Sequence, residues 1–321
     1  MKITIAICTW NRCALLKETL EQISRLAIPR DVEWELLVVN NNSTDATAEV
    51  LESFATRVPV RAVLEVEPGL SNARNRAVRE ATGEYILWTD DDVLVDEQWM
   101  SAYHNAFLRW PEAAIFGGNV EPWFAGTPPQ WLLRVWSRVA TAYASRELGE
   151  QSVSLSNEVL PFGANFAVRT VEQRRYLYDP RLGVKPGSVM GGEETTVVKS
   201  MLADGIVGRW VPAARVRHYI PEARQTIEYL RKYYRGYGEY CARQDATTTN
   251  AKLLGAPRWL WREAFTEETK YRLHRYVSQP EVWIAYLIAS SQAWGQLHGF
   301  KERHCDAEAE RHGGKIKNEV I

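Results

Sequence analysis

Several features that would assign a protein to a functional class at sight are scarce or absent in this chain. Its four cysteines are scattered without paired metal-ligand spacing, which argues against a cysteine-ligated metal site and predicts reduced thiols in a cytosolic protein. Neither sign of charge dominates, since the net charge is -1, and a broad basic face for nucleic acid is therefore not expected. A strand-like run already begins at Ile3 after a single lysine, so we expect no signal peptide.

Apolar residues are plentiful by contrast. Of the 321 residues, 45% are hydrophobic and 25% are charged, which excludes a disordered chain and allows a large buried core. A chain of this length is typical of one large α/β domain or of two smaller domains.

The first third of the chain alternates between short apolar runs and longer amphipathic segments. Such alternation is typical of a mostly parallel sheet with helices on both faces. The pattern predicts strands around Ile3 to Ile7 and over 34–39, 60–66 and 85–89, with helices over 14–26, 48–54, 71–80 and 96–110.

The pattern becomes less regular after residue 110. A stretch rich in Pro and Trp over 122–136 indicates a long excursion or flap, and strand character returns over 159–168 and 207–211. A helix is predicted over 195–203, and the chain is helical and aromatic from residue 224 onward. We therefore expect an α/β domain over 1–222 and a helical extension rich in aromatic and basic residues over 223–321.

Three consecutive carboxylates, Asp90, Asp91 and Asp92, end the apolar run at 85–89. Acids crowded at a strand end repel one another and resist desolvation, so a positive group is expected nearby, and a hard divalent cation is one candidate. The alternative is a solvated acidic turn. The alternation of side chains along a strand would place Asp90 and Asp92 on one side and Asp91 on the other.

Polar clusters follow each of the predicted strands of the first third, at 9–12, 40–45, 74–75 and 90–92. Parallel strands bring their carboxyl ends to one edge of a sheet, where a nucleotide can lie across them. No Gly-Lys-Ser/Thr phosphate loop is present, so a bound diphosphate would need a metal ion.

Five short motifs occur in an order shared with a known family. They are residues 8–12, residues 38–45, Gly69 with residues 73–75, residues 90–92 and residues 192–194. Taken together they resemble the family 2 glycosyltransferases of the GT-A fold, over about two-thirds of the chain, from Ile3 to His218.

The resemblance implies inverting transfer of a sugar from a nucleoside diphosphate donor. Asn40 stands where the family usually has an Asp facing uracil, and its amide oxygen still accepts from a uracil N–H, so UDP is the expected carrier. Mn²⁺ or Mg²⁺ is implied as cofactor, with Asp92 and His218 as metal ligands. The nucleotide-binding residues implied are Thr9, Asn11, Arg12, Asn40, Asn42, Arg74, Asp90 and Asp91.

A general base is needed to take the proton of the acceptor hydroxyl. Family members carry Glu-Asp at this point, whereas this chain has Glu193-Glu194, so Glu194 occupies the base position with one more methylene and Glu193 is the alternative. Two acids that merely favour a helix N-terminus are the structural alternative. The glycine-containing segments 117–119 and 163–165 are expected to shape the donor-sugar and acceptor pocket.

The C-terminal third mixes arginines with aromatic residues, as in 229–235 and 258–262. Such helices suit peripheral contact with the inner face of the cell membrane, where a lipid-linked glycan acceptor is presented, or they simply pack on the core. Ser290, Ser291, Gln292 and Gln296 interrupt the apolar run at 282–300, which argues against a membrane span. The Gln/Arg-x-x-Arg-Trp signature of processive synthases is missing.

We therefore expect a non-processive, metal-dependent glycosyltransferase of cell-surface glycan synthesis, located in the cytoplasm or at the inner membrane face. One alternative is a nucleotidyltransferase, which would want a glycine-rich loop where residues 9–12 have none. The other is an inactive glycan-binding or membrane scaffold protein, which would not need Asp90, Asp92, Glu194 and His218 together.

Overall fold

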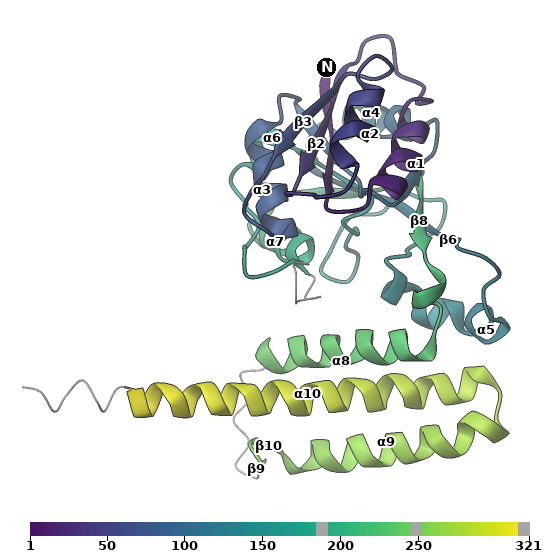
Figure 1. Cartoon of the computed structure of the whole chain (residues 1–321), viewed down its shortest axis with the longest axis vertical. Coiled ribbons are helices and arrows are strands. Elements are labelled where there is room, and N and C mark those ends of the chain that lie inside the picture. Colours follow the sequence, from purple (N-terminus) through teal and green to yellow (C-terminus); the bar gives the residue numbers. More distant parts are fainter. Residues whose placement is uncertain (184–191, 245–251, 314–321) are drawn as a thin grey trace, which may run out of the picture. The chain divides into compact units, whose positions relative to one another are not determined.

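The chain forms two compact units in a computed structural model that describes residues 1–183, 192–244 and 252–313 (Figure 1). The first unit comprises Met1–Trp123 and Tyr143–Ile220, and the second comprises Phe124–Ala142 and Pro221–Ile321. The segment Phe124–Ala142 thus belongs with the C-terminal helices although it lies within the sequence of the α/β region.

A mixed sheet in the order β3-β2-β1-β4-β7-β6-β8-β5 forms the centre of the first unit. The pairs β3/β2, β2/β1 and β1/β4 are parallel, as expected from the strand–helix alternation, whereas β4/β7, β7/β6 and β8/β5 are antiparallel. The α/β fold class is confirmed. The strands are β1 (Lys2–Thr9), β2 (Glu33–Asn40), β3 (Val60–Leu64), β4 (Tyr85–Trp88), β5 (Val93–Val95), β6 (Ile115–Phe124), β7 (Phe166–Arg169) and β8 (Gly208–Ile220).

Helices cover both faces of this sheet because alternate strand residues point to opposite sides. Ile3 and Ile5 of β1 belong to a buried cluster with residues of the first, second and fourth helices, whereas Ala6 belongs to a second cluster with the third and seventh helices. The helices of this unit are α1 (Cys13–Ile23), α2 (Thr47–Phe54), α3 (Leu70–Glu80), α4 (Trp99–Arg109), α6 (Thr170–Gln173) and α7 (Glu193–Ala203), with a 3-10 turn η1 (Ala140–Tyr143) that begins in the other unit.

The strand register places the predicted polar clusters at one edge. Thr9, the last residue of β1, lies opposite Asn40, the last residue of β2. Trp88 ends β4 opposite Ala6, so Asp90 follows close to the end of β1. The carboxyl ends of three neighbouring parallel strands therefore meet where the sequence predicts a nucleotide.

The structure corrects several predicted elements. The stretch 122–136 is no flap, because β6 runs to Phe124 and α5 (Gln130–Val139) follows, burying Leu132, Val135 and Val139 at helical spacing. The strand predicted over 159–168 begins only at Phe166, and β8 extends to Ile220 instead of ending at 211. Strand β5 was not expected, because three residues are too few for a periodic signal.

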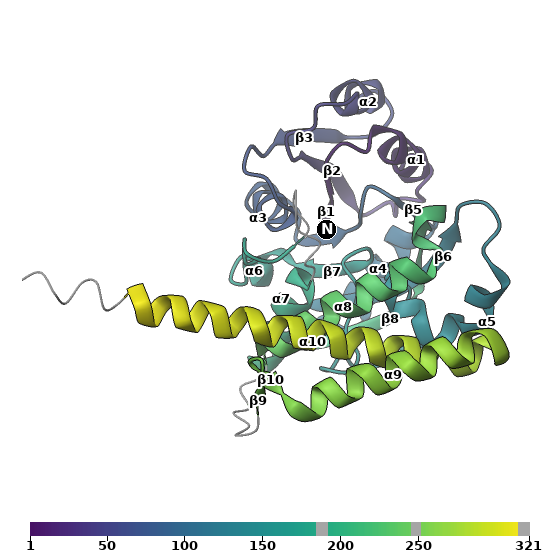
Figure 2. The same cartoon turned by 60° about the horizontal axis from the view of Figure 1, so that its bottom comes forward.

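The second unit is a helical layer. Its elements are α5, the 3-10 turn η2 (Glu222–Arg224), α8 (Ile227–Gln244), α9 (Arg258–Val277), α10 (Pro280–Gly313) and a small hairpin of β9 (Lys252–Leu253) and β10 (Ala256–Pro257). Helix α10 lies between α8 and α9 (Figures 1 and 2). Gly238 and Gly295 allow the backbones of α8 and α10 to approach, because a Cβ at either position would collide with the backbone of the other helix. Among the described helices, none combines the length and apolar character needed to cross a membrane.

Candidate active site

Two of the three consecutive carboxylates are held by one arginine. Nη1 of Arg12, just after β1, lies 3.0 Å from Oδ1 of Asp91 and 2.8 Å from Oδ2 of Asp92. The buried hydroxyl of Thr9 donates to the other oxygen of Asp91 at 2.8 Å. Burial and the charge of Asp92 nevertheless raise the pKa of Asp91 to about 7. Arg12 is therefore a positive group beside these acids, as their crowding predicted.

The third carboxylate, Asp90, faces a different arginine. Its Oδ1 lies 3.4 Å from Nη2 of Arg74, a residue of α3 whose side chain is buried. The predicted grouping of Asp90 with Asp92 therefore fails in its contacts, since Asp91 and Asp92 share a partner. The physical reason is that β4 ends at Trp88, so the regular alternation of a strand no longer applies to the turn that follows.

Arg74 connects the carboxylates to the start of α7. Its Nε lies 3.8 Å from Oε1 of Glu193, and its guanidinium carbon lies 5.5, 5.9 and 5.5 Å from the ring centroids of Trp88, Phe166 and Tyr178. Nη1 is buried and has no hydrogen-bond partner within the part of the chain that the structure describes. A buried N–H donor of this kind is costly unless it meets an acceptor, and a phosphate oxygen is a suitable one.

Glu193 and Glu194 occupy the first turn of α7, after Gly192 with a positive φ of 97°. Both acids are therefore placed where the helix dipole favours negative charge. Glu193 is buried against Arg74, and burial together with the charge of Glu194 raises the pKa of Glu193 to about 8. Glu194 is only half-buried, so the two acids differ in environment and in the access they give to a substrate.

His218 lies beside Asp92, as the resemblance implied. Its Nε2 is 3.4 Å from Oδ1 of Asp92, and its Nδ1 is 3.1 Å from the carbonyl oxygen of Tyr143. A carbonyl oxygen can only accept, so Nδ1 is the donor in that contact and Nε2 is the nitrogen that faces Asp92. No group of three or more His, Cys, Asp or Glu side chains suited to a metal occurs among the described residues.

The predicted asparagines shape the loops at the ends of β1 and β2. Asn11 and Asn42 adopt positive φ angles of 54° and 63°, which asparagine tolerates better than most residues. The side-chain oxygen of Asn40 accepts from the backbone N–H of Ser43 at 2.8 Å, and that of Asn11 accepts from the N–H of Thr44 at 2.7 Å. The hydrogen bond from the Ser43 N–H already occupies one lone pair of the Asn40 side-chain oxygen, which is the atom expected to accept from uracil.

The sequence did not predict the three aromatic rings around Arg74, which belong to Trp88, Phe166 and Tyr178. Tyr178 lies far from Arg74 in the sequence, in a segment without periodicity. The sequence also did not predict the role of Asn165, which accepts from Trp99 Nε1 at 2.8 Å and from the hydroxyl of Tyr103 at 2.7 Å. The amide of Asn165 donates to the carbonyls of Asn119 and Ala214 at 2.8 Å each. All four bonds are buried, so Asn165 crosslinks the core instead of pointing its amide to a ligand.

Comparison with known proteins agrees with the motifs. Residues 4–159 match the family model described as Glycosyl transferase family 2. The succinoglycan biosynthesis protein ExoM of Rhizobium meliloti (strain 1021) is 23% identical over 244 residues, which cover 72% of this chain and 71% of that protein. For several other curated relatives the match covers only 17% to 28% of their length.

Two solved structures share the fold over nearly the whole chain. One is the mannosyltransferase PcManGT of Pyrobaculum calidifontis in complex with GDP-Man and Mn²⁺, with a TM-score of 0.57, 20% identity and coverage of 91% of this chain and 86% of that one. The other is residues 1–349 of TarS of S. aureus in complex with UDP, with a TM-score of 0.52, 15% identity and coverage of 96% and 92%. Residues 4–159 belong to the family 2 glycosyltransferases, and the chain has the GT-A fold.

Proposed function

We propose that this protein transfers a single sugar, with inversion, from a nucleoside diphosphate donor to a hydroxyl of a glycan or lipid-linked glycan acceptor. The observation that carries the proposal is the buried Arg74, which lies between Asp90 and Glu193 and whose Nη1 has no hydrogen-bond partner in the described part of the chain. It connects the polar edge where the nucleotide is expected to the helix that carries the expected base.

In the proposed step, the oxygen of the acceptor hydroxyl attacks the anomeric carbon of the donor sugar. Glu194 accepts the proton of that hydroxyl. The bond from that carbon to the diphosphate oxygen breaks, and the diphosphate leaves with the bonding electrons. Arg74 is placed to donate to the departing diphosphate, which stabilises charge that develops during the step. Glu193 acts through Arg74 as a positioning residue, because its side chain is buried against that guanidinium.

Asp92 and His218 suit a divalent cation, since an oxygen and an imidazole nitrogen are ligands that Mn²⁺ accepts, and Mg²⁺ is held by carboxylates. When bound, such an ion would act as a Lewis acid toward the diphosphate. Only these two side chains are assigned to the ion, so donor oxygens or water would complete its coordination.

UDP is the proposed carrier, because an Asn40 oxygen can accept from uracil and because the TarS structure was obtained with UDP. The PcManGT structure holds a guanine nucleotide, so GDP is the natural competitor to test. We place the activity in the cytoplasm, in cell-surface glycan synthesis, with the aromatic and basic C-terminal helices in peripheral contact with the inner membrane face.

Ligand-induced stabilisation tests donor binding without any knowledge of the acceptor. Nucleoside diphosphates and sugar nucleotides are added to wild-type protein with Mn²⁺, with Mg²⁺ or with a chelator, and the melting temperature is recorded. We expect one nucleotide to raise it in the presence of metal and to lose this effect in Asp92→Ala. Glu52→Ala, which removes an exposed carboxylate of α2, serves as the matched control. A flat panel with well-folded protein would favour the non-catalytic binding protein.

The base is tested by comparing Glu194→Gln with Glu193→Gln. Loss of a general base typically costs about 10²–10⁴-fold in turnover, so Glu194→Gln should lose that much sugar-nucleotide cleavage while its stabilisation by nucleotide is kept. Glu193→Gln should lose less of the sugar-nucleotide cleavage activity than Glu194→Gln does. Undiminished cleavage by Glu194→Gln would move the base to another residue, and Glu158→Gln controls for loss of an exposed acid.

A further inference from the structure

The buried guanidinium of Arg74 is held only loosely by carboxylates. Its two ion pairs, with Asp90 and with Glu193, measure 3.4 and 3.8 Å. A guanidinium N–H that is tightly bound to a carboxylate lies about 2.7–2.9 Å from the oxygen. Because both distances are longer than this, other contacts are needed to fix the position of this side chain, which is 3% exposed.

Three buried aromatic rings supply those contacts. The ring centroids of Trp88, Phe166 and Tyr178 lie 5.5, 5.9 and 5.5 Å from the guanidinium carbon of Arg74. A cation within about 6 Å of a ring centroid is attracted by the electrons of the ring face, and more strongly where water is excluded. This attraction occupies no N–H donor, so the rings hold the charge of Arg74 and leave its donors for a ligand.

Gly163 leaves room for the same guanidinium. A Cβ at this position would lie 2.6 Å from Nη2 of Arg74 and 3.4 Å from its Nη1 and its guanidinium carbon. Any side chain at residue 163 would therefore displace the buried guanidinium from its place beside the rings.

Two of the three rings are placed by the sheet, whereas the third is placed by one side chain. Trp88 of β4 lies opposite Phe166 of β7 in the antiparallel register, so their rings stack on one face of the sheet. Tyr178 lies outside the helices and strands. The amide of Asn75 in α3 donates to the carbonyl of Tyr178 and accepts from its N–H, at 2.8 Å in each of these buried bonds. Since Asn75 follows Arg74 directly, α3 carries the arginine and also fixes the ring beside it.

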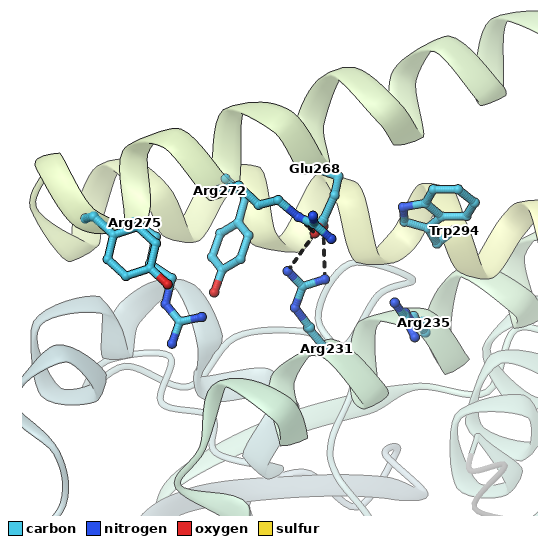
Figure 3. A pocket seen from close by; sticks show the side chains of 8 residues that line it. Arg231, Arg235, Glu268, Arg272, Arg275 and Trp294 are labelled. Atoms are coloured by element: carbon cyan, nitrogen blue, oxygen red, sulfur yellow. Dashed lines mark hydrogen bonds and ion pairs between the residues drawn. The ribbon is translucent and has the colours of Figure 1, made fainter.

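An arginine of the second unit shows the opposite arrangement. Arg231 of α8 lies 4.6 Å from the ring centroid of Tyr271, which is also buried. Two N–H donors of Arg231, however, bind Glu268 at 3.0 and 3.2 Å (Figure 3). Arg74 meets its carboxylates at longer distances, and its Nη1 has no hydrogen-bond partner in the described part of the chain. The rings around Arg74 therefore hold a cation that can still donate.

We propose that Tyr178 and Asn75 are positioning residues of the donor site and act through Arg74. Asn75 holds the backbone of Tyr178, and the ring of Tyr178 holds the guanidinium where it can donate to the diphosphate of the donor. The inference rests on the proposed function, because the diphosphate is the ligand that Arg74 is expected to bind.

A double-mutant cycle tests whether Tyr178 acts through Arg74. The dissociation constants of UDP and GDP are measured by calorimetry on the full chain with Mn²⁺, for wild type, Tyr178→Leu, Arg74→Ala and the double variant. We expect Tyr178→Leu to weaken binding by about tenfold, which is about 1.4 kcal/mol. In the Arg74→Ala background the same change should weaken binding no further. Tyr178→Phe keeps the ring and should stay within about threefold of wild type.

Each variant has a matched control. Tyr271→Leu removes a buried ring beside Arg231 in the other unit and should bind nucleotide as wild type does. Asn75→Ala should lose about as much affinity as Tyr178→Leu. Asn72→Ala changes an asparagine of the same helix whose side chain bonds at an exposed place, and it should lose none.

Additive losses from Tyr178→Leu and Arg74→Ala would overturn the inference alone, because they would show an effect of Tyr178 that does not pass through Arg74. An equal loss in Tyr271→Leu would overturn it as well, as would wild-type affinity in Tyr178→Leu. Absence of UDP and GDP binding to wild type would overturn the proposed function and this inference with it. Circular dichroism verifies the fold of each variant, and Asn75→Ala replaces Tyr178→Leu in the cycle if the latter does not fold.

Discussion

At the scale of single residues, two arginines divide the acidic side chains of the predicted donor site between them. Arg12 holds Asp91 and Asp92, whereas Arg74 holds Asp90 and lies near Glu193. Partly buried acids of this density would repel one another without such partners. A nucleotide that binds here therefore meets side chains whose positions are fixed by contacts within the protein, so little reordering is needed.

Thr9→Val tests how much the hydrogen bond from the Thr9 hydroxyl to Asp91 contributes to the stability of the fold. The change keeps the shape of the side chain but removes the hydroxyl that donates to Asp91 at 2.8 Å in a buried place. A buried acceptor that loses its partner costs about 1–3 kcal/mol. We expect urea denaturation to show a loss of this size, whereas Thr56→Val, at an exposed position, should change little. Equal losses of stability in the two variants would mean that the Thr9–Asp91 hydrogen bond contributes nothing to the free energy of unfolding.

The stability of the protein should also depend on pH through Glu193. Its pKa rises from 4.5 to about 8 on folding, so the folded state binds more protons than the unfolded state between these values. Stability then falls as pH rises through this window. Denaturation midpoints measured from pH 5 to 9 should fall less steeply for Glu193→Gln than for wild type, with Asp91 responsible for part of the remaining slope. An unchanged slope would contradict the raised pKa.

At the scale of elements, the close packing of α8 against α10 requires glycine at position 238 of α8 but not at position 236. A Cβ at Gly238 would collide with the backbone of Gln292 in α10, whereas a Cβ at Gly236 would meet nothing within 4 Å. The two glycines therefore form a matched pair on one helix.

Gly238→Ala should lower the free energy of unfolding by about 1–3 kcal/mol, because α8 and α10 must move apart or strain. Gly236→Ala should raise it by about 0.5–1 kcal/mol, because alanine is the better helix former. Both values come from chemical denaturation followed by circular dichroism. A stabilising Gly238→Ala would show that the two helices are not packed so closely in solution.

Element prediction succeeded where the signal was local and failed where it was not. The alternation of β1, α1 and β2 was evident because each element carries its own apolar period. Helix α5 was hidden because Pro128 and Pro129 precede it and suggested a loop, although Pro129 is in fact its N-cap residue. The glycines of 117–119, which were expected to shape the donor-sugar and acceptor pocket, lie within β6, where Gly118 makes room for the carbonyl oxygen of Ala214 and the amide of Asn165.

At the scale of the whole molecule, the predicted donor site belongs to the first compact unit, whereas α8, α9 and α10 belong to the second. Hydrogen–deuterium exchange with the nucleotide that stabilises the protein should therefore show protection at the ends of β1 and β4 and at the start of α7. The backbone of α9 should exchange at its unliganded rate. Protection confined to α8, α9 and α10 would place the nucleotide in the wrong unit and contradict the proposed donor site.

The sequence by itself determined the fold class, the polar edge of the sheet and the family, because each rests on short local patterns in a fixed order. Only the tertiary structure decided which carboxylate contacts which arginine. Arg12 contacts Asp91 across 79 positions of sequence, and Arg74 contacts both Asp90 and Glu193. The close approach of α8 and α10 at Gly238 and Gly295 likewise exists only once these two helices pack together. Pairing between distant residues follows from register and helix packing, and no local period encodes either.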